Sequence, residues 1–221
     1  MTDENKPTGA RGAAPEGVDG DARVTAPLSL RERQKQRRRH RIYSVAISLF
    51  RERGFEATTA TEIAKQAHVS RGTFFNYYPY KEAVLLDYGA EVIGNLAEKA
   101  REHSAGGLEP LAVLQEMWGE LAEVSVRERD LIPPLVYELI NPDPQRARAA
   151  FERLPLSRIF MNLLREVPGL RDDVPLERIA QSFTDSFLMT TLRWTAYRDE
   201  RDVRADLRSA FNLIMEGAFR R

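Results

Sequence analysis

The side chains best suited to binding another molecule lie on one face of a short predicted helix that begins after Ser70. That face carries Arg71, Gly72, Phe75 and Asn76. An arginine can bind the edge of a guanine through two hydrogen bonds, and a phenyl ring can pack on a thymine methyl group. Glycine costs a helix about 1 kcal/mol relative to alanine, and the close approach of a DNA groove is one reason to tolerate it. The pattern predicts DNA recognition rather than catalysis, with Arg71 and Asn76 reading bases.

A second set of side chains around this face suits the DNA backbone. Hydroxyl groups, an ammonium group and the N-terminal amides of helices all bind phosphate oxygens. Such groups are supplied by Thr59, Ser70, Thr73, Tyr77 and Lys81. Each has an ordinary alternative, as a helix cap (Thr59 and Ser70), as part of the core, or as a solvated surface charge (Lys81). The set as a whole points to DNA more strongly than any member does.

Two short helices and a tight turn must position these groups, and a longer helix must support them. Ser29 with Glu32 and Thr59 with Glu62 each fit a capping box, the reciprocal pairing that starts a helix, and Ser70 starts the helix that follows the second of these. Upstream, apolar residues recur at helical spacing until Gly54, a residue that commonly ends a helix. We therefore expect a three-helix helix-turn-helix domain over residues 29–80.

One contiguous motif covers this region, G-F-x-x-T-T-x-x-x-I-A-x-x-A-x-V-S-x-G-T-F-F-x-Y-Y-x-x-K-E from Gly54 to Glu82. It resembles the DNA-binding domain of the TetR family of bacterial transcriptional regulators, because cap, turn, recognition helix and lysine fall in register. The resemblance implies that all residues of the two sets above contact DNA. Two positions depart from the family pattern. His68 stands where glycine is usual in the turn, and Phe75 stands where a tyrosine hydroxyl usually reaches a phosphate.

The remainder of the chain is also predicted to be helical. Shorter helical stretches, one interrupted by Pro133 and Pro134 and one with a break or restart at Pro155, lie between longer helices. The longer helices span about 80–103, 108–125, 175–197 and 203–219. We expect an all-α fold of about nine helices, in which residues 81–221 form a larger helical domain for ligand binding and dimerisation. Residues 1–28, rich in glycine and proline, are predicted to be a disordered tail.

The composition excludes several classes of protein. The chain has 221 residues, no formal net charge and no cysteine, which rules out disulfides, thiolate zinc sites and cysteine nucleophiles. No apolar run approaches the ~18 residues of a membrane span or resembles a signal peptide. We therefore expect a cytoplasmic protein without membrane association, cofactor or metal. Between Arg31 and Arg41, seven Arg and Lys residues accompany one Glu. This run is either the solvated start of the first helix or a segment that contacts DNA.

The TetR resemblance implies a body that binds a small-molecule effector and forms a homodimer through the last two helices. The helix over 203–219 is apolar most of the way round, so it must be covered on two sides, one of which can be a second copy. For the effector we expect an apolar or aromatic molecule. Its predicted contacts are Met117, Trp118, Tyr137, Phe160, Phe183, Thr184, Asp185 and Phe187. Ordinary core packing is the alternative explanation for the aromatic residues among them.

The favoured hypothesis is a homodimeric repressor that binds a palindromic double-stranded DNA operator and leaves it when a small molecule binds. The alternative is a transcriptional activator or a ligand-independent DNA-binding protein; a body that binds no ligand would have no sizeable cavity. An enzyme is disfavoured, because none of the three histidines, His40, His68 and His103, has a nearby partner that suggests a catalytic triad or a metal site.

Overall fold

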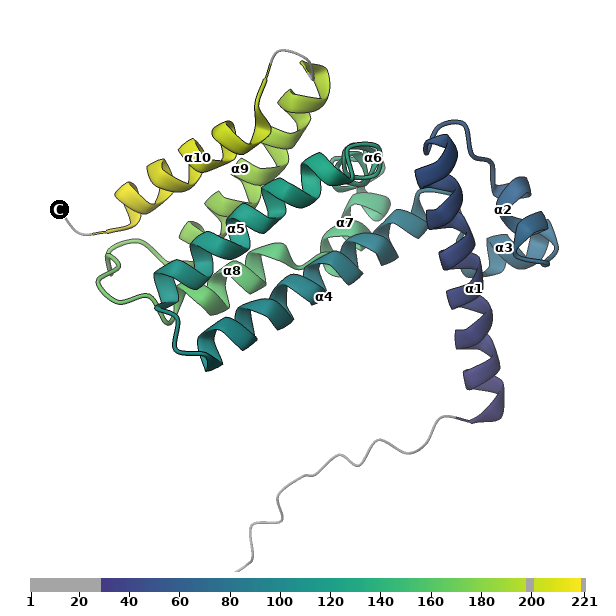
Figure 1. Cartoon of the computed structure of the whole chain (residues 1–221), viewed down its shortest axis with the longest axis horizontal. Coiled ribbons are helices and arrows are strands. Elements are labelled where there is room, and N and C mark those ends of the chain that lie inside the picture. Colours follow the sequence, from purple (N-terminus) through teal and green to yellow (C-terminus); the bar gives the residue numbers. More distant parts are fainter. Residues whose placement is uncertain (1–28, 198–200, 220–221) are drawn as a thin grey trace, which may run out of the picture.

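The computed structural model describes residues 29–197 and 201–219, which form ten helices and no strand (Figure 1). A single isolated β-bridge joins Leu170 to Phe219. The all-α architecture predicted from the sequence is confirmed. The predicted disordered tail, residues 1–28, lies outside the described residues.

Three helices form the N-terminal head: α1 (Leu30–Arg53), α2 (Ala60–Gln66) and α3 (Arg71–Tyr77). All three begin at side-chain caps that the sequence predicts, because local hydrogen bonds to the first amides decide where a helix starts. The head core draws on all three helices and on the residue after α3. Its buried side chains include Ile42, Ala46, Leu49, Phe50, Ile63, Phe74 and Tyr78.

Two residues of the head adopt left-handed backbone conformations. Gly54 ends α1 with a φ of 86°, which a residue with a side chain rarely adopts. His68, in the turn between α2 and α3, has a φ of 51°. The residue that replaces the usual glycine therefore takes the conformation that glycine would take, which histidine tolerates better than most residues do.

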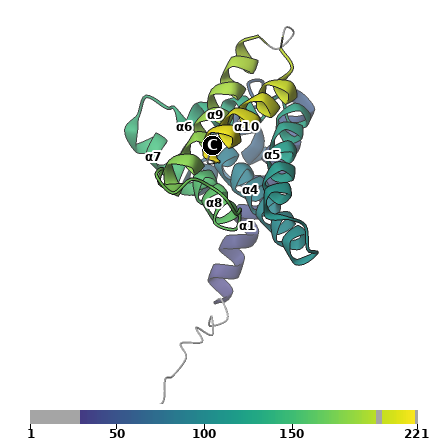
Figure 2. The same cartoon turned by 90° about the vertical axis from the view of Figure 1, so that its left-hand side faces the viewer.

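Seven helices form the body. They are α4 (Ala83–Ala105), α5 (Pro110–Arg127), α6 (Ile132–Leu139), α7 (Pro144–Arg153), α8 (Leu156–Leu164), α9 (Leu176–Ala196) and α10 (Val203–Ala218). Helices α4, α5, α8, α9 and α10 pack alongside one another, and α6 and α7 lie at the end of this bundle nearest the head (Figures 1 and 2). Within the described residues, no helix is both long and apolar enough to cross a membrane.

Prolines mark helix starts in this body. Pro133 and Pro134 occupy the first turn of α6, so the predicted interruption of a helix at these residues is wrong. The first amides of a helix have no partner within it, so a proline there loses no hydrogen bond. Pro155 separates α7 from α8, as the sequence predicts.

Candidate nucleic-acid interface and apolar cavity

The recognition helix α3 presents a mixed outer face. Arg71, Gly72 and Asn76 are exposed, whereas Phe74 is fully buried. Phe75 lies between these extremes: its ring contacts that of Phe74 at a centroid distance of 5.3 Å, and the Arg71 guanidinium lies 5.5 Å above it. Phe75 thus packs on the core with one edge and supports an exposed cation with its face.

Gly72 is not required by packing within the protein. A Cβ atom added at Gly72 would meet only the Ser70 hydroxyl oxygen, at 3.9 Å, which is an ordinary contact. Its backbone conformation is helical, so a side chain would introduce no strain. Packing within the protein therefore does not explain this glycine, and the space beside it leaves room for the close approach of a groove edge.

The predicted phosphate-binding hydroxyls lie at the two helix starts. The Thr59 hydroxyl accepts from the Glu62 amide at 3.2 Å, and the Glu62 carboxylate accepts from the Thr59 amide at 2.9 Å and lies 2.8 Å from its hydroxyl. These bonds lower the pKa of Glu62. The Ser70 hydroxyl accepts from the Thr73 amide at 3.0 Å and lies 2.8 Å from the Thr73 hydroxyl. Capping therefore fixes these hydroxyls beside helix N-terminal amides, where phosphate oxygens bind well.

Lys81 and Tyr77 are tied into the head. The Lys81 ammonium donates to the Phe55 carbonyl at 2.8 Å and lies 4.0 Å above the Phe55 ring, so Lys81 is not simply a solvated charge. An ammonium group has three hydrogens, and this bond uses one of them. Tyr77 is half-buried. All the predicted DNA contacts lie on α3, at its flanks or at the start of α2, and their contact with DNA stays a prediction.

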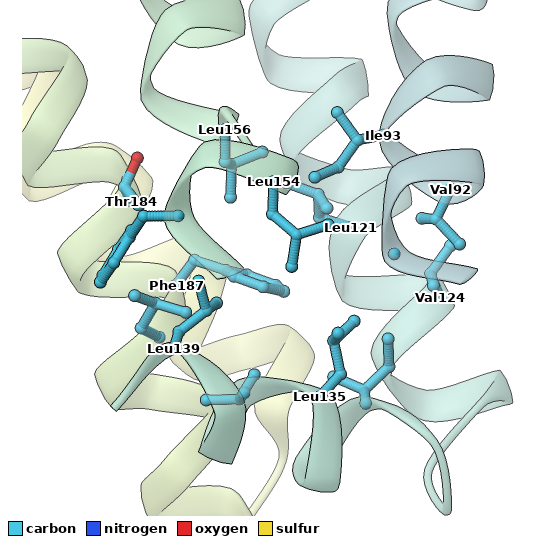
Figure 3. A pocket seen from close by; sticks show the side chains of 15 residues that line it. Val92, Ile93, Leu121, Val124, Leu135, Leu139, Leu154, Leu156, Thr184 and Phe187 are labelled. Carbon is cyan, nitrogen blue, oxygen red and sulfur yellow. The ribbon is translucent and has the colours of Figure 1, made fainter. Parts of the chain in front are cut away.

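The body contains an apolar cavity between α4, α5, α6, α9 and the link from α7 to α8 (Figure 3). Its free volume is about 50 Å³. Of the fifteen described residues that line it, fourteen are apolar and one, Thr184, carries a hydroxyl. That hydroxyl already donates to the Ala180 carbonyl at 3.4 Å. Phe151, which is 44% exposed, places part of the lining at the protein surface. The cavity therefore suits hydrocarbon rather than a charged or strongly polar group.

Gly89 lets α4 approach the other walls of the cavity. A Cβ atom at Gly89 would lie 2.8 Å from the Cδ2 atoms of both Leu135 and Leu154, closer than such atoms ever pack. Sequence reasoning missed this part of the site. The available signal was a glycine in the middle of a long helix, which usually marks a close approach by another element.

The predicted effector contacts do not form one group. Thr184 and Phe187 line the cavity (Figure 3). Trp118, Phe160 and Phe183 instead pack on one another with ring centroids 5.2–5.6 Å apart, in a core between α5, α8, α9 and α10.

This aromatic core is closed by hydrogen bonding as well as by packing. The Trp118 indole donates to the Leu207 carbonyl at 2.7 Å, so its polar atom is satisfied within the protein. Met117 is buried off the cavity, Tyr137 is 50% exposed, and Asp185 is exposed, accepting from Gln181 at 2.8 Å. Three of the aromatic residues named for effector contact therefore pack in this core, and their contact with an effector stays a prediction.

Three carboxylates of the body accept hydrogen bonds from side chains of the head, and Asp87 accepts more of them than Glu91 or Glu128. Asp87, on α4, accepts from Arg39 of α1 at 2.9 and 3.1 Å, from the Tyr78 hydroxyl at 2.8 Å and from Arg153 of α7 at 2.7 Å. Burial and the Asp87 charge raise the pKa of Tyr78, so its phenol stays protonated and donates. We call these four residues the Asp87 cluster. Two of them are close in sequence to residues that line the cavity, because Asp87 lies two residues before Gly89 and Arg153 directly precedes Leu154.

Helix α7 also contacts Tyr80, in the segment between α3 and α4. Arg146 stacks on the Tyr80 ring at 3.8 Å and donates to the buried Glu138 carboxylate of α6 at 2.6 Å. Because α7 also supplies Phe151 to the cavity, it contacts both the cavity and the base of the head.

Helices α9 and α10 each carry an exposed large apolar side chain. These helices lie side by side at the edge of the body away from α4 (Figure 1). Met189 is 53% exposed and Leu213 is 70% exposed, with Leu192 and Ile214 half-buried. Exposed side chains of this size, on the two predicted dimer helices, are the residues a second copy would cover.

A helix-turn-helix head on a separate helical body with an apolar cavity defines the class of DNA-binding regulators with a sensor domain. A family model of TetR/AcrR transcriptional repressor C-terminal domains matches residues 90–217, and a model of bacterial regulatory proteins of the tetR family matches residues 42–88. The chain belongs to the TetR family of ligand-responsive, DNA-binding transcriptional repressors, which are not enzymes. The described residues bring together no group of His, Cys, Asp or Glu that could hold a metal ion.

Three relatives illustrate the range of similarity. The crystal structure of Thermus thermophilus FadR, a TetR family repressor in complex with lauroyl-CoA, is 52% identical, with a TM-score of 0.77, and the match covers 83% of this chain and 96% of that one. The repressor KstR of Mycobacterium tuberculosis is 24% identical over 97% of both chains. The Bacillus subtilis regulator YerO is 31% identical over 58% of this chain, and the match spans only 45% of YerO.

Proposed function

We propose that this protein is a homodimeric repressor that binds a palindromic operator and is released by a long-chain fatty acyl-CoA thioester. One observation carries the choice of effector: a body cavity lined almost wholly by hydrocarbon, in a chain 52% identical to a repressor crystallised with lauroyl-CoA. This deepens the expectation of an apolar effector. In this proposal the acyl chain enters the cavity and the charged CoA portion remains outside.

The cavity must widen to admit an acyl chain. Its free volume is about 50 Å³, whereas pockets for small molecules usually measure about 300–1,000 Å³. The side-chain ends of Leu135 and Leu154 fill the space next to Gly89, and they are the groups that an entering chain displaces. Because protein interiors are close-packed, such a displacement shifts neighbouring helices rather than compressing them.

The connection from the cavity to the head runs through α4 and α7. Asp87 lies two residues before Gly89, and Arg153 directly precedes Leu154, so both partners of one ion pair adjoin cavity-lining residues. Displacement of either helix changes the Asp87 cluster and with it the seating of α1 and Tyr78. To change a mostly DNA-competent population into a mostly incompetent one, the effector must prefer the second state by roughly 5 kcal/mol.

The dimer supplies the geometry for operator recognition. We propose that the outer apolar face of α9 and α10, with Met189 and Leu213 at its centre, pairs with the same face of a second copy. Two heads would then place their α3 helices in successive major grooves, about 34–36 Å apart. An effector that alters the seating of each head alters this spacing.

An operator-release assay tests this proposal. A fluorescent operator, selected in vitro with the purified protein, is followed by anisotropy while lauroyl-CoA, free CoA or laurate is added. We expect release by lauroyl-CoA at concentrations at which CoA and laurate leave the complex intact. Equal release by free CoA, or no response to acyl-CoA of any length, would contradict the proposal.

A pair of variants locates the effect in the cavity. Val92→Phe adds bulk to a half-buried wall position, so it should weaken the response to lauroyl-CoA while operator affinity is retained. Val126→Phe makes the same change at a half-buried position of α5 off the cavity and serves as the control. An unchanged response in Val92→Phe would place the effector elsewhere.

A further inference from the structure

The first three turns of α1 extend beyond the head core. We call residues 30–41 the overhang. Ile42 is the first buried residue of α1, and every residue of the overhang except Arg39 is exposed. At about 1.5 Å per helical residue, the overhang is roughly 18 Å long. Figures 1 and 2 show this part of α1 projecting past α3 and away from the body. It also precedes residue 42, where the match to the family's DNA-binding domain begins.

The overhang carries unpaired positive charge. Arg39 binds Asp87, and the one acidic residue, Glu32, accepts from the Ser29 amide in the capping box. The other six cations form no ion pair within the described residues, and they lie in two rows at helical spacing. Those rows are Arg31, Lys35 and Arg38, which continue the stripe of Ile42, and Arg33, Arg37 and Arg41, which lie opposite Arg39.

This arrangement works against the stability of the helix that carries it. Like charges four residues apart on a helix destabilise it by a few tenths of a kcal/mol per pair. Arg33 precedes Arg37 by four residues, and Arg37 precedes Arg41 by four. These rows of like charge do not help the helix when it is surrounded only by water, whereas an anionic partner would neutralise them. Double-stranded DNA offers such a partner, with about one phosphate per 1.7 Å of its axis.

The base of the overhang is fixed to the recognition helix. Arg39 donates to the carbonyl of Tyr77, the last residue of α3, at 3.4 Å, and its guanidinium stacks on the Tyr78 ring at 4.7 Å. When α3 lies in a major groove, the overhang therefore begins beside that groove and runs along the neighbouring DNA.

We propose that the overhang is a second DNA-binding surface, which holds backbone phosphates flanking the half-site bound by α3. Guanidinium and ammonium groups bind phosphates regardless of the bases, so the overhang adds affinity and salt dependence without adding sequence specificity. This interaction rests on the operator binding proposed above, but it does not involve the effector.

The experiment compares the salt dependence of DNA binding by the full chain, without effector. The variant R33Q/R37Q/R41Q removes one row, and glutamine keeps a helix propensity close to that of arginine. Three phosphate contacts on each half-site account for a slope of about 2.7 in log affinity against log salt, or about 5.4 for the two half-sites of the dimer, which between 50 and 200 mM corresponds to roughly an 1,800-fold change. On an operator duplex with ten extra base pairs on each side, we expect the slope measured for the variant to be smaller than that of the parent by up to this amount. Its preference for operator over a scrambled duplex should be unchanged.

Two further variants make the result decisive. R31Q/K35Q/R38Q removes the other row and should also lower the slope. R101Q/R158Q/R165Q removes the same charge from exposed positions on α4, on α8 and directly after α8, and should match the parent. Equal slopes for the parent and both overhang variants would overturn the proposal, as would an equal loss in the body variant. A lower slope together with lost sequence preference would also overturn it, because the overhang would then read bases. Circular dichroism of each variant checks that α1 remains helical.

Discussion

Replacement of Asp87 by asparagine tests the junction between head and body. The side chain keeps its shape but loses its charge, and its new amide donor faces the donors of Arg39 or Arg153. In the parent, the Asp87 carboxylate accepts two bonds from Arg39, one from Tyr78 and one from Arg153, and its side chain is 14% exposed. Asp87→Asn should therefore lower the free energy of unfolding and loosen the seating of the head.

The size of the effect follows from the exposure of the partners. Hydrogen bonds to charged groups contribute about 1.5–3 kcal/mol each when buried. Arg39 and Arg153 are 43% and 52% exposed, so each ion pair contributes about 1 kcal/mol or less. The hydrogen bond from the Tyr78 phenol and the misplaced amide donor add to these ion pairs. We therefore expect Asp87→Asn to lower the free energy of unfolding by about 2 kcal/mol. For a chain of this size that lowers the melting temperature by about 4–8 °C.

Thermal and urea unfolding, followed by circular dichroism at fixed protein concentration, measure this loss. Glu109→Gln makes the same acid-to-amide change at an exposed position whose side chain makes no cap hydrogen bond, and it should fall within about 0.5 kcal/mol of the parent. If Asp87→Asn were no less stable than Glu109→Gln, the Asp87 cluster would not hold the junction and our account of effector coupling would fail with it.

Four other substitutions test separate parts of the structure. Arg71→Ala should cost ~1–3 kcal/mol of operator binding and relax the preference at one base pair, measured with single-base operator variants. Phe75→Tyr should strengthen binding to operator and scrambled duplexes alike, since a hydroxyl restores a phosphate contact. Leu213→Asp should shift the protein toward monomer in analytical ultracentrifugation, because it places a charge on the proposed dimer face. Burial raises the pKa of Tyr88 to about 12 from 10.0, so the stability that its neutral phenol contributes is full below pH 10 and lost as pH rises through 12. Tyr88→Phe should therefore show a shallower loss of stability in urea titrations between pH 10 and 12.

The head could be predicted from the sequence because its signals are local. The capping boxes at Ser29 and Thr59 and the terminating Gly54 each act within a few residues, and the structure confirms all three. The departure at His68 was likewise visible as a residue type at a fixed place in a motif, and the structure shows it in a left-handed conformation.

The cavity could not be predicted in the same way, because it forms where several helices meet. Trp118 and Phe183 carry the same apolar, helically spaced signal whether they pack against one another or against a ligand, and here they pack against one another. The residues that matter for the cavity include Gly89 and Leu154, whose proximity depends on how α4 crosses the link between α7 and α8. Similarly, only the observed start of α6 distinguishes Pro133 in a first turn from a proline that breaks a helix.

For the acyl-CoA effector proposed above, the narrowness of the cavity has a consequence for which acyl chains would be distinguished. Moving Leu135 and Leu154 aside requires much the same work for any chain that enters, whereas each methylene buried afterwards contributes about 0.8 kcal/mol. Short chains gain too little to offset that work, and every added methylene beyond a minimum length favours opening by the same increment. A sensor built in this way has a threshold in chain length. It does not respond to short acyl groups, and its response to longer ones increases with length until the cavity is filled.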